Sequence, residues 1–318
     1  MYYLGIDGGG TKTKYTLVDE KLKKVMEVEG GTTHIHQVGT EGIRKEITGN
    51  LNKILDGLNI KEEDIAYTFA GIPGYGESLE DQNKIDALLK EIFKMPYRAD
   101  NDGLNAWAAG TACKEGINVI AGTGSIAYGM NKEGVMARCG GFGPGIGDDG
   151  SAYWIGLKTI NAYTKQKEGR MERTALYDLI EEKYKISYKY EIVDIVFNQL
   201  KFNRTELAKF SIICGQAANL GCEVCKGIFE EAAKEIFAHI RVLAKDLNLK
   251  DSFVISYSGG VFKAGDLVLK PLKNLIKESG LKATLQEPVL NPWDGSVLLA
   301  YTLAGNEVPD NIKDILSE

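Results

Sequence analysis

Short apolar runs alternate with amphipathic segments along the first hundred residues. Four of the runs have the length and composition of strands: 2–7, 14–18, 25–29 and 65–70. A helix is predicted over 41–58, because Ile43, Ile47, Leu51 and Leu55 recur at every fourth position and would share one face. A second helix is expected near 79–93, followed by a short strand that ends at Asp100. This alternation predicts an α/β protein.

The opening pattern recurs once in the second half of the chain. An apolar strand at 117–121 leads through a glycine-rich turn to another strand at 126–130. Helical segments then fill 151–247, and strands are expected at 253–257 and 283–286. Two domains are therefore predicted. The first spans 1–112, and the last helix, 308–318, is expected to return to it. The second spans 113–307 and contains a helical insertion.

The first glycine-rich loop follows the first strand and contains Gly9, Gly10 and Thr11. Consecutive glycines remove every Cβ, so backbone N–H groups can close on phosphate oxygens. Asp7, at the end of the strand, can hold a hydrated Mg²⁺ ion, and Thr11 offers a hydroxyl to the phosphates. A flexible β-hairpin without a ligand is the alternative, and this loop alone does not decide between them.

The second loop reads Gly122-Thr123-Gly124-Ser125 after an apolar strand. With the alanine two residues further on, it matches the dinucleotide pattern G-x-G-x-x-A, which requires a helix to follow. The residues at 126–130 predict a strand instead, so a Rossmann site is excluded. The sequence also lacks the G-x-x-x-x-G-K-[ST] phosphate loop.

Two glycine hairpins more than 100 residues apart resemble the phosphate loops of the actin-like ATPase superfamily. Ser258-Gly259-Gly260 resembles its adenosine-binding segment. The segment 139–154, which ends in Gly-Ser-Ala-Tyr-Trp, resembles the sugar-binding loop of the N-acetylglucosamine kinases in the BadF/BadG/BcrA/BcrD ATPase family. The resemblance runs from Gly5 to Ala300. It implies two actin-like, ribonuclease H-like domains with a nucleotide-binding cleft between them, and ATP and Mg²⁺ as cofactors.

The resemblance also implies roles for individual residues. Asp102, at a strand-to-helix junction, matches the general base that accepts the proton of the attacking hydroxyl. A helix N-cap is the alternative for Asp102, and a cap is the expected role of Asp149. Ala218, Gly259 and Gly260 match nucleotide contacts. The positions that match sugar contacts are Gly141, Phe142, Gly143 and Asp148, together with Asp102.

The match changes at the segment 31–39, which occupies the place of a sugar-contact loop. His34 stands where the characterised kinases have Asn, and His36 where they have an aromatic residue. An imidazole cannot copy the hydrogen-bonding pattern of a carboxamide, so the particular sugar stays open. His-x-His on a strand would place both rings on one face, but no nearby Cys or Asp completes a ligand set, so a metal site is disfavoured. Cys222 and Cys225 are expected to be buried small apolar positions in a helix.

The predicted function is transfer of the γ-phosphate of ATP to a hydroxyl, the 6-hydroxyl, of N-acetylglucosamine or a related amino sugar. Two alternatives stay open. An activating ATPase of a dehydratase or reductase would hold an iron–sulfur cluster through a cysteine shortly before Gly122, where Val119, Ile120 and Ala121 stand. A non-catalytic, sugar-sensing actin-like protein would keep the loops without needing Asp102.

Composition limits the classes of molecule that the protein is expected to bind. The chain has 318 residues, a net charge of −6 and no long basic run, which disfavours nucleic acid and anionic membrane surfaces. The start lacks the basic region of a signal peptide, and no apolar stretch approaches the roughly 18 residues of a membrane span. Five scattered cysteines fit a reduced, cytoplasmic protein. The expected partner is a small sugar. A homodimer is compatible with the sequence, which does not decide the oligomeric state.

Overall fold

The computed structural model describes residues 1–317 and divides into two compact units. The first comprises residues 1–115 and the tail from Glu287 on, and the second comprises Gly116–Gln286. Each unit has its own five-stranded sheet and its own cluster of buried apolar side chains. The mixed α/β class predicted from the sequence is confirmed.

The first unit is built on a mixed sheet with the strand order β3-β2-β1-β4-β5. The strands are β1 (Tyr2–Gly8), β2 (Thr13–Asp19), β3 (Lys24–Gly30), β4 (Ile65–Ile72) and β5 (Tyr97–Asn101). Strand β2 is antiparallel to both β1 and β3, whereas β4 runs parallel to both β1 and β5. Antiparallel neighbours can be joined by short turns, and parallel ones need a crossover, which here contains a helix.

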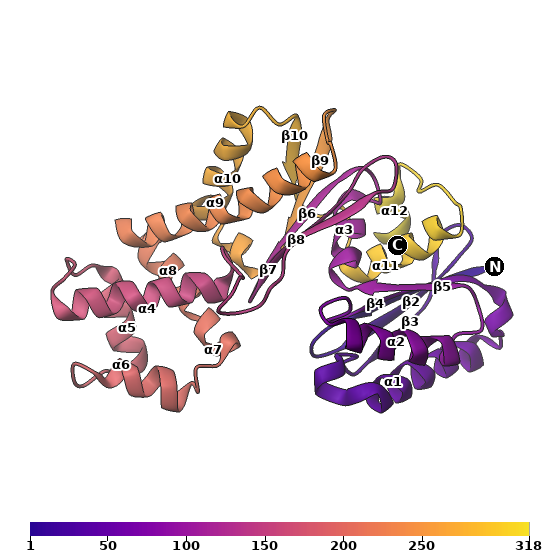
Figure 1. The fold of residues 1–318 in the computed structure, drawn as a ribbon, viewed down its shortest axis with the longest axis horizontal. Helices are drawn as coiled ribbons and strands as arrows, with labels where there is room; N and C mark the ends of the chain where they lie inside the picture. Colours follow the sequence, from indigo (N-terminus) through magenta and orange to yellow (C-terminus); the bar gives the residue numbers. More distant parts are fainter. Residues whose placement is uncertain (318) are drawn as a thin grey trace. The chain divides into compact units, whose positions relative to one another are not determined.

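Helices cover both faces of this sheet (Figure 1). Helices α1 (Ile35–Leu58) and α2 (Leu79–Ile92) lie along one face, and α3 (Gly103–Thr111) and α11 (Pro292–Leu303) along the other. The remaining helical segments are η1 (Glu62–Asp64) and α12 (Ile312–Ser317). Ile43, Ile47 and Leu51 are buried, as the fourfold spacing predicts. Gly39 has a φ of 64° and interrupts α1, so the regular helix begins close to the predicted start.

The last boundary between the two units lies at Glu287, earlier than the expected position 307. Helix α11 packs against β1 and α3 of the first unit, and the backbone N–H of Leu290 donates to the carbonyl of Ala109. A Cβ on Gly295 would overlap the carbonyl oxygen of Asn105, so the two helices are in backbone contact there. Residues 287–307 therefore belong with the first unit and not with the second, because α11 covers the sheet face that α1 and α2 leave open.

The second unit repeats the topology of the first. Its sheet has the order β10-β9-β6-β7-β8, with antiparallel pairs β6–β7 and β7–β8 and parallel pairs β6–β9 and β9–β10. The strands are β6 (Gly116–Ala121), β7 (Ser125–Met130), β8 (Met136–Gly140), β9 (Phe253–Ser258) and β10 (Ala283–Gln286). The recurrence predicted from the two strand–glycine–strand patterns is thus confirmed at the level of whole sheets.

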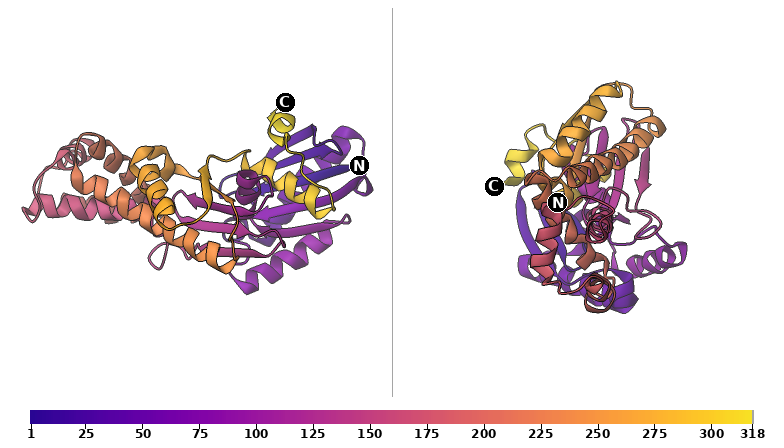
Figure 2. Two further views of the ribbon diagram at one scale, coloured as in Figure 1. Left: turned by 90° about the horizontal axis from the view of Figure 1, so that it is seen from above. Right: turned by 90° about the vertical axis from the view of Figure 1, so that its left-hand side faces the viewer.

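Helices make up most of the rest of the second unit. They are α4 (Ala152–Glu168), α5 (Ala175–Tyr184), α6 (Glu191–Asp194), η2 (Ile195–Gln199), α7 (Arg204–Ala208), α8 (Phe210–Asn219), α9 (Glu223–Asp246), η3 (Gly260–Ala264) and α10 (Asp266–Glu278). Helices α4 and α9 lie side by side (Figure 2). Cys222 and Cys225 are buried in this layer, as predicted. Within residues 1–317, no helix has both the length and the apolar character that crossing a bilayer requires.

Candidate active site

The first glycine loop forms a tight turn between β1 and β2. The strands pair from Tyr2 to Gly8, so residues 9–12 make the turn. A Cβ on Gly8 would lie 2.5 Å from Thr33 Oγ1 and 2.6 Å from the carbonyl oxygen of Gly71, so only glycine fits there. The Thr32 hydroxyl donates to the carbonyl of Gly9 over 2.7 Å. The base of the turn is thus held by contacts at Gly8 and Gly9, while Gly10 and Thr11 are exposed at its tip.

Asp7, next to this turn, is held by a residue that the sequence did not single out. Asn105 Nδ2 donates to Asp7 Oδ1 over 2.7 Å and to the carbonyl of Ile6 over 3.4 Å. Burial raises the pKa of the Asp7 carboxyl to about 6, because the loss of solvation outweighs the hydrogen bond from Asn105 and the charge of Lys14. Asn105 Oδ1 is buried and has no partner among the described residues. A carboxylate and an orphaned amide oxygen are hard oxygen donors of the type that Mg²⁺ prefers.

Asp102 lies at the junction of β5 and α3, where a helix cap would stand. Its side chain makes no N-cap hydrogen bond, and Asn101 Oδ1 accepts from the N–H of Gly103 over 3.0 Å instead. Burial raises the pKa of the Asp102 carboxyl to about 7, and the negative charge of Asp7 adds to this shift. The junction therefore holds a carboxyl whose pKa lies near neutrality and which is not used as a cap.

His34 and His36 do not lie on a strand, so the expected strand geometry is wrong. His34 caps α1, and its Nδ1 accepts from the backbone N–H of His36 over 3.3 Å. His36 is already in the helix, and its Nε2 lies 3.2 Å from Asp81 Oδ2. The capping bond turns the chain into the helix one residue after His34. Within residues 1–317, no three His, Cys, Asp or Glu side chains are grouped to hold a metal ion.

The second glycine loop is also a tight turn, and two charged side chains are fastened to it. The N–H of Gly122 donates to the carbonyl of Gly124 over 2.9 Å. Asp148 Oδ1 accepts from the N–H of Ser125 over 3.2 Å, and its Oδ2 accepts from Arg204 Nη2 over 2.6 Å. The Asp148 side chain is only 2% exposed, whereas that of Arg204 is 40% exposed. Asp148 therefore joins the loop to an arginine from the helical insertion.

The helix after Asp148 is capped by a different residue from the one expected. Ser151 Oγ accepts from the N–H of Trp154 over 3.2 Å, so Ser151 and not Asp149 is the N-cap of α4. Gly150 has a φ of 76°, which turns the chain between the acidic pair and the helix. The carbonyl of Asp149 accepts from Ser125 Oγ over 2.7 Å. Both residues of the acidic pair thus bond to Ser125, Asp148 through its side chain and Asp149 through its backbone carbonyl, and Ser151 provides the cap.

The predicted sugar loop begins beside the same hairpin. The N–H of Gly141 donates to the carbonyl of Ser125 over 2.9 Å. Phe142 is 69% exposed, and a Cβ on Gly143 would meet no atom within 4 Å. Gly141 is therefore held against β7, while the side chain of Phe142 is exposed and the Cβ position of Gly143 faces open space.

The predicted adenosine segment lies directly against the second hairpin. Gly259 has a φ of 105°, and a Cβ there would overlap the carbonyl oxygen of Ala121, so the backbones touch. Gly260 begins η3, and α8 packs against η3. Ala218, on α8, is 1% exposed, so its side chain belongs to the core. The second unit thus brings the hairpin, Gly259 and Asp148 together.

Sequence reasoning missed two residues of these arrangements, Asn105 and Arg204. Asn105 carried a signal, because it follows Asp102 by three positions and so lies on the same side of a predicted helix. Arg204 is 56 residues from Asp148, and nothing around it indicates that pairing.

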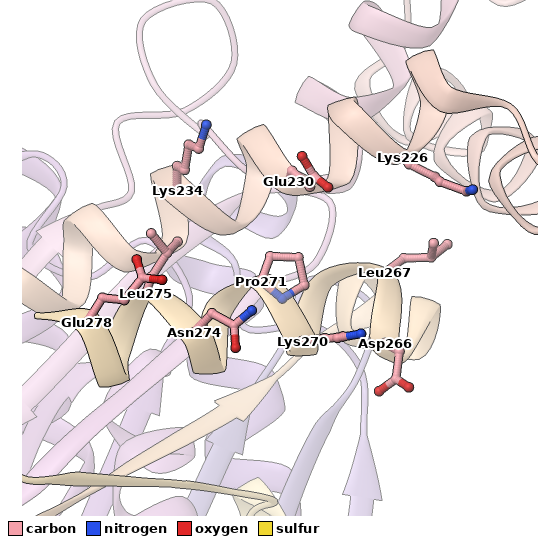
Figure 3. Close-up of a pocket in the computed structure, with 10 residues that line it drawn as sticks. All are labelled: Lys226, Glu230, Lys234, Asp266, Leu267, Lys270, Pro271, Asn274, Leu275 and Glu278. Carbon is pink, nitrogen blue, oxygen red and sulfur yellow. The ribbon is translucent and has the colours of Figure 1, made fainter.

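A groove of about 380 Å³ lies elsewhere in the second unit, along α9 and α10 (Figure 3). Lys226 and Glu230 line one side, and Lys270 and Asp266 line the other. Its lining mixes both signs of charge and includes none of the predicted site residues. The groove therefore shares no lining residue with either glycine loop.

Residues 4–300 match the model of the BadF/BadG/BcrA/BcrD ATPase family. The chain belongs to this family. The resemblance inferred from the two hairpins and the 139–154 segment is therefore confirmed, and membership in an ATPase family implies the use of ATP. The matched range includes both hairpins, Asp102, Asp148 and Gly259.

Two curated family relatives cover most of the chain. An N-acetylmuramic acid/N-acetylglucosamine kinase of Clostridium acetobutylicum is 32% identical over 262 residues, which are 82% of this chain and 85% of the relative. An N-acetyl-D-glucosamine kinase of Dictyostelium discoideum is 28% identical over 309 residues, which are 94% and 97% of the two chains.

The fold has solved counterparts. The structure of a Chromobacterium violaceum protein classed as an N-acetylglucosamine kinase has a TM-score of 0.70 at 19% identity and covers 94% of this chain and 98% of its own. A hexokinase structure from Thermus thermophilus has a TM-score of 0.59 at 14% identity, with 95% and 99% covered. At these identities the likeness concerns the fold, and it agrees with the two-domain, actin-like architecture predicted from the sequence.

Proposed function

We propose that this protein is an ATP-dependent kinase that phosphorylates a hydroxyl, the 6-hydroxyl, of N-acetylglucosamine or a closely related amino sugar. The observation that carries this proposal is Asp102. A carboxyl with a pKa of about 7 is half ionised near neutral pH, which is the range in which a general base works best. Family membership and the two kinase relatives support the sugar as acceptor.

Both glycine hairpins are assigned to the phosphates of ATP. In the first, the proposed contacts are Gly9, Gly10 and Thr11 at the exposed tip. In the second they are the four residues of the turn: Gly122, Thr123, Gly124 and Ser125. Gly259 and Gly260 are assigned to the adenosine. The buried position of Ala218 supports a packing contribution to that segment.

The proposed sugar contacts are His34, Gly141, Phe142, Gly143 and Asp148, together with the base. Asp148 already accepts one hydrogen bond on each oxygen, and each oxygen retains a further lone pair for a sugar hydroxyl. His34 uses Nδ1 for its cap, which leaves Nε2 as the nitrogen that can contact a ligand. His34 can therefore make one hydrogen bond to the sugar, as a donor or as an acceptor, where the carboxamide of an asparagine can donate and accept at once.

The reaction is a displacement at phosphorus. The sugar oxygen bonds to the γ-phosphorus, the bond from that phosphorus to the β,γ-bridging oxygen breaks, and ADP takes the electron pair. Asp102 accepts the proton of the attacking hydroxyl. Mg²⁺, when bound, neutralises charge on the phosphates. Asp7 is the proposed holder of this ion and would contact it through the ion's water ligands. Asn105 orients the Asp7 carboxylate through the 2.7 Å hydrogen bond.

An ADP-release assay over a panel of sugars tests the proposal. The panel contains N-acetylglucosamine, glucosamine, N-acetylmuramic acid and glucose, each with ATP and with or without Mg²⁺. We expect sugar-dependent ADP release with an N-acetylated sugar, and its loss when the ion is chelated. Hydrolysis of ATP at the same rate with and without every sugar would contradict the kinase assignment.

A further inference from the structure

The backbone just before Arg204 is strained. Arg204 begins α7, two positions after Phe202, and Lys201 and Phe202 have φ values of 53° and 48°. Two residues with side chains in the left-handed region are costly, and such strain persists where the surroundings enforce it. Asn203 then fixes the start of the helix, because its Oδ1 accepts from the N–H groups of Thr205 and Glu206 over 2.9 and 3.2 Å. The local chain is thus shaped to present Arg204 in one direction.

That direction is toward the second glycine hairpin. Arg204 Nη2 lies 2.6 Å from Asp148 Oδ2, and the other oxygen of Asp148 accepts the N–H of Ser125. A Cβ on Gly124 would overlap Arg204 Nη2, so the guanidinium rests against the turn itself. The absence of a side chain at Gly124 is therefore required by the arginine.

The guanidinium has donors to spare at this place. An arginine carries five N–H donors in a planar fork, and the bond to Asp148 uses one of them. Nε is buried and has no partner among the described residues. The Arg204 side chain is 40% exposed although the carboxylate it binds is nearly covered. The guanidinium is therefore fixed to the protein through Nη2 and covered at Nε, and the exposed part of the side chain remains available to an anionic ligand.

We propose that Arg204 binds a phosphate oxygen of ATP at the second hairpin and stabilises the negative charge there as the γ-phosphoryl group moves. This rests on the proposed function, since it takes the Gly122–Ser125 turn as a phosphate site. The turn offers neutral backbone N–H groups, and the buried carboxylate of Asp148 beside it would repel a triphosphate if its charge were not offset. A planar cation matches the geometry of phosphate oxygens and offsets that repulsion.

The experiment compares Arg204→Gln and Arg204→Lys with a matched control, Arg241→Gln. Arg241 is an exposed arginine of the same unit, on α9, with no assigned role. Isothermal titration measures binding of the non-hydrolysable analogue AMP-PNP and of adenosine. A hydrogen bond between charged partners contributes enough to predict a loss of about 10–100-fold in AMP-PNP affinity for Arg204→Gln. Adenosine affinity should stay within about twofold, and the Lys variant should fall between.

Adenosine binding and the melting temperature show whether each variant is folded. If Arg204→Gln binds AMP-PNP as the wild type does but has a raised KM for the sugar, Arg204 only positions Asp148 and the proposal fails. A loss confined to N-acetylmuramic acid would assign the guanidinium to the carboxylate of that sugar, and would also overturn it. A wild-type protein that binds no AMP-PNP and releases no ADP with any sugar would instead remove the proposed function, together with this inference.

Discussion

Burial raises the pKa of both Asp7 and Asp102, and the charge of Asp7 raises that of Asp102 further. Asn105 is hydrogen-bonded to Asp7, and the charge of Asp7 raises the pKa of Asp102. The pKa is raised to about 6 for Asp7 and to about 7 for Asp102. At neutral pH the pair carries less than its full charge, and a bound cation would favour full ionisation.

The raised pKa of Asp102 makes a prediction about stability. Its pKa rises from 3.8 to about 7 on folding, so the folded state keeps a proton that the unfolded state loses. That contribution to the free energy of unfolding is complete below pH about 4 and is lost as the pH rises through about 7. The Asp102→Asn protein does not titrate there. Its melting temperature should therefore gain on that of the wild type between pH 5 and pH 8, as measured in the absence of Mg²⁺.

The control is the same pair of melts at pH 5 and pH 8 with the exposed Asp251→Asn protein, which should track the wild type. A difference between Asp102→Asn and wild type that is the same at every pH would mean that Asp102 titrates normally.

At the scale of elements, the second hairpin depends on a backbone contact from β9. Gly259 touches the carbonyl of Ala121 and has a φ of 105°. Gly259→Ala should lower the free energy of unfolding by about 1–3 kcal/mol for the backbone conformation and by a further 1–3 kcal/mol or so for the overlap. It should also weaken ATP binding, because the displaced strand end carries the turn with it.

Gly280→Ala is the matched control for that change. Gly280 also has a positive φ, of 76°, but a Cβ there meets nothing within 4 Å. It should show the conformational cost alone and leave ATP affinity unchanged. Urea unfolding and nucleotide titration of both proteins check this, and equal losses in the two variants would contradict the contact.

Periodicity and glycine placement predicted the elements well but not how they begin. The helix over 41–58 and both hairpins follow from local patterns, because burial at every fourth position and missing Cβ atoms leave a record in the sequence. The caps did not follow. Ser151 is the cap that was expected at Asp149, because the backbone carbonyl of Asp149 accepts from Ser125 in the second hairpin and the helix begins three residues later. His34 begins a helix where a strand was expected, since its own ring supplies the capping acceptor.

At the scale of the molecule, one topology occurs twice, and the tail completes the first copy. Helix α11 approaches β1 so closely that a Cβ on Gly5 would overlap the N–H of Val297. The recurrence could be predicted because each copy has its own strand–glycine–strand pattern. The return of 287–307 could not, because it depends on glycines that make room for a contact nearly 300 residues away in sequence. The Arg204–Asp148 pair was missed for the same reason.

Two glycine-to-alanine changes test the return of the tail. Gly49 lies within α1 with nothing near its Cβ position, so Gly49→Ala should stabilise the protein by about 0.5–1 kcal/mol. Gly295 lies within α11, where alanine favours the helix equally, but its Cβ would overlap Asn105. Gly295→Ala should therefore destabilise the protein and shift its urea midpoint downward. If both changes stabilise the protein alike, α11 does not pack on α3.

The central claim is that Asp102 is the base of a sugar kinase, and kcat of the Asp102→Asn protein tests it most directly. The change is nearly isosteric, and asparagine would serve almost equally well if the residue only capped a helix. A positioned base contributes about 10²–10⁴-fold, so kcat with the best sugar should fall at least about a hundredfold while the KM for ATP changes little. A folded Asp102→Asn protein with wild-type kcat would contradict the account.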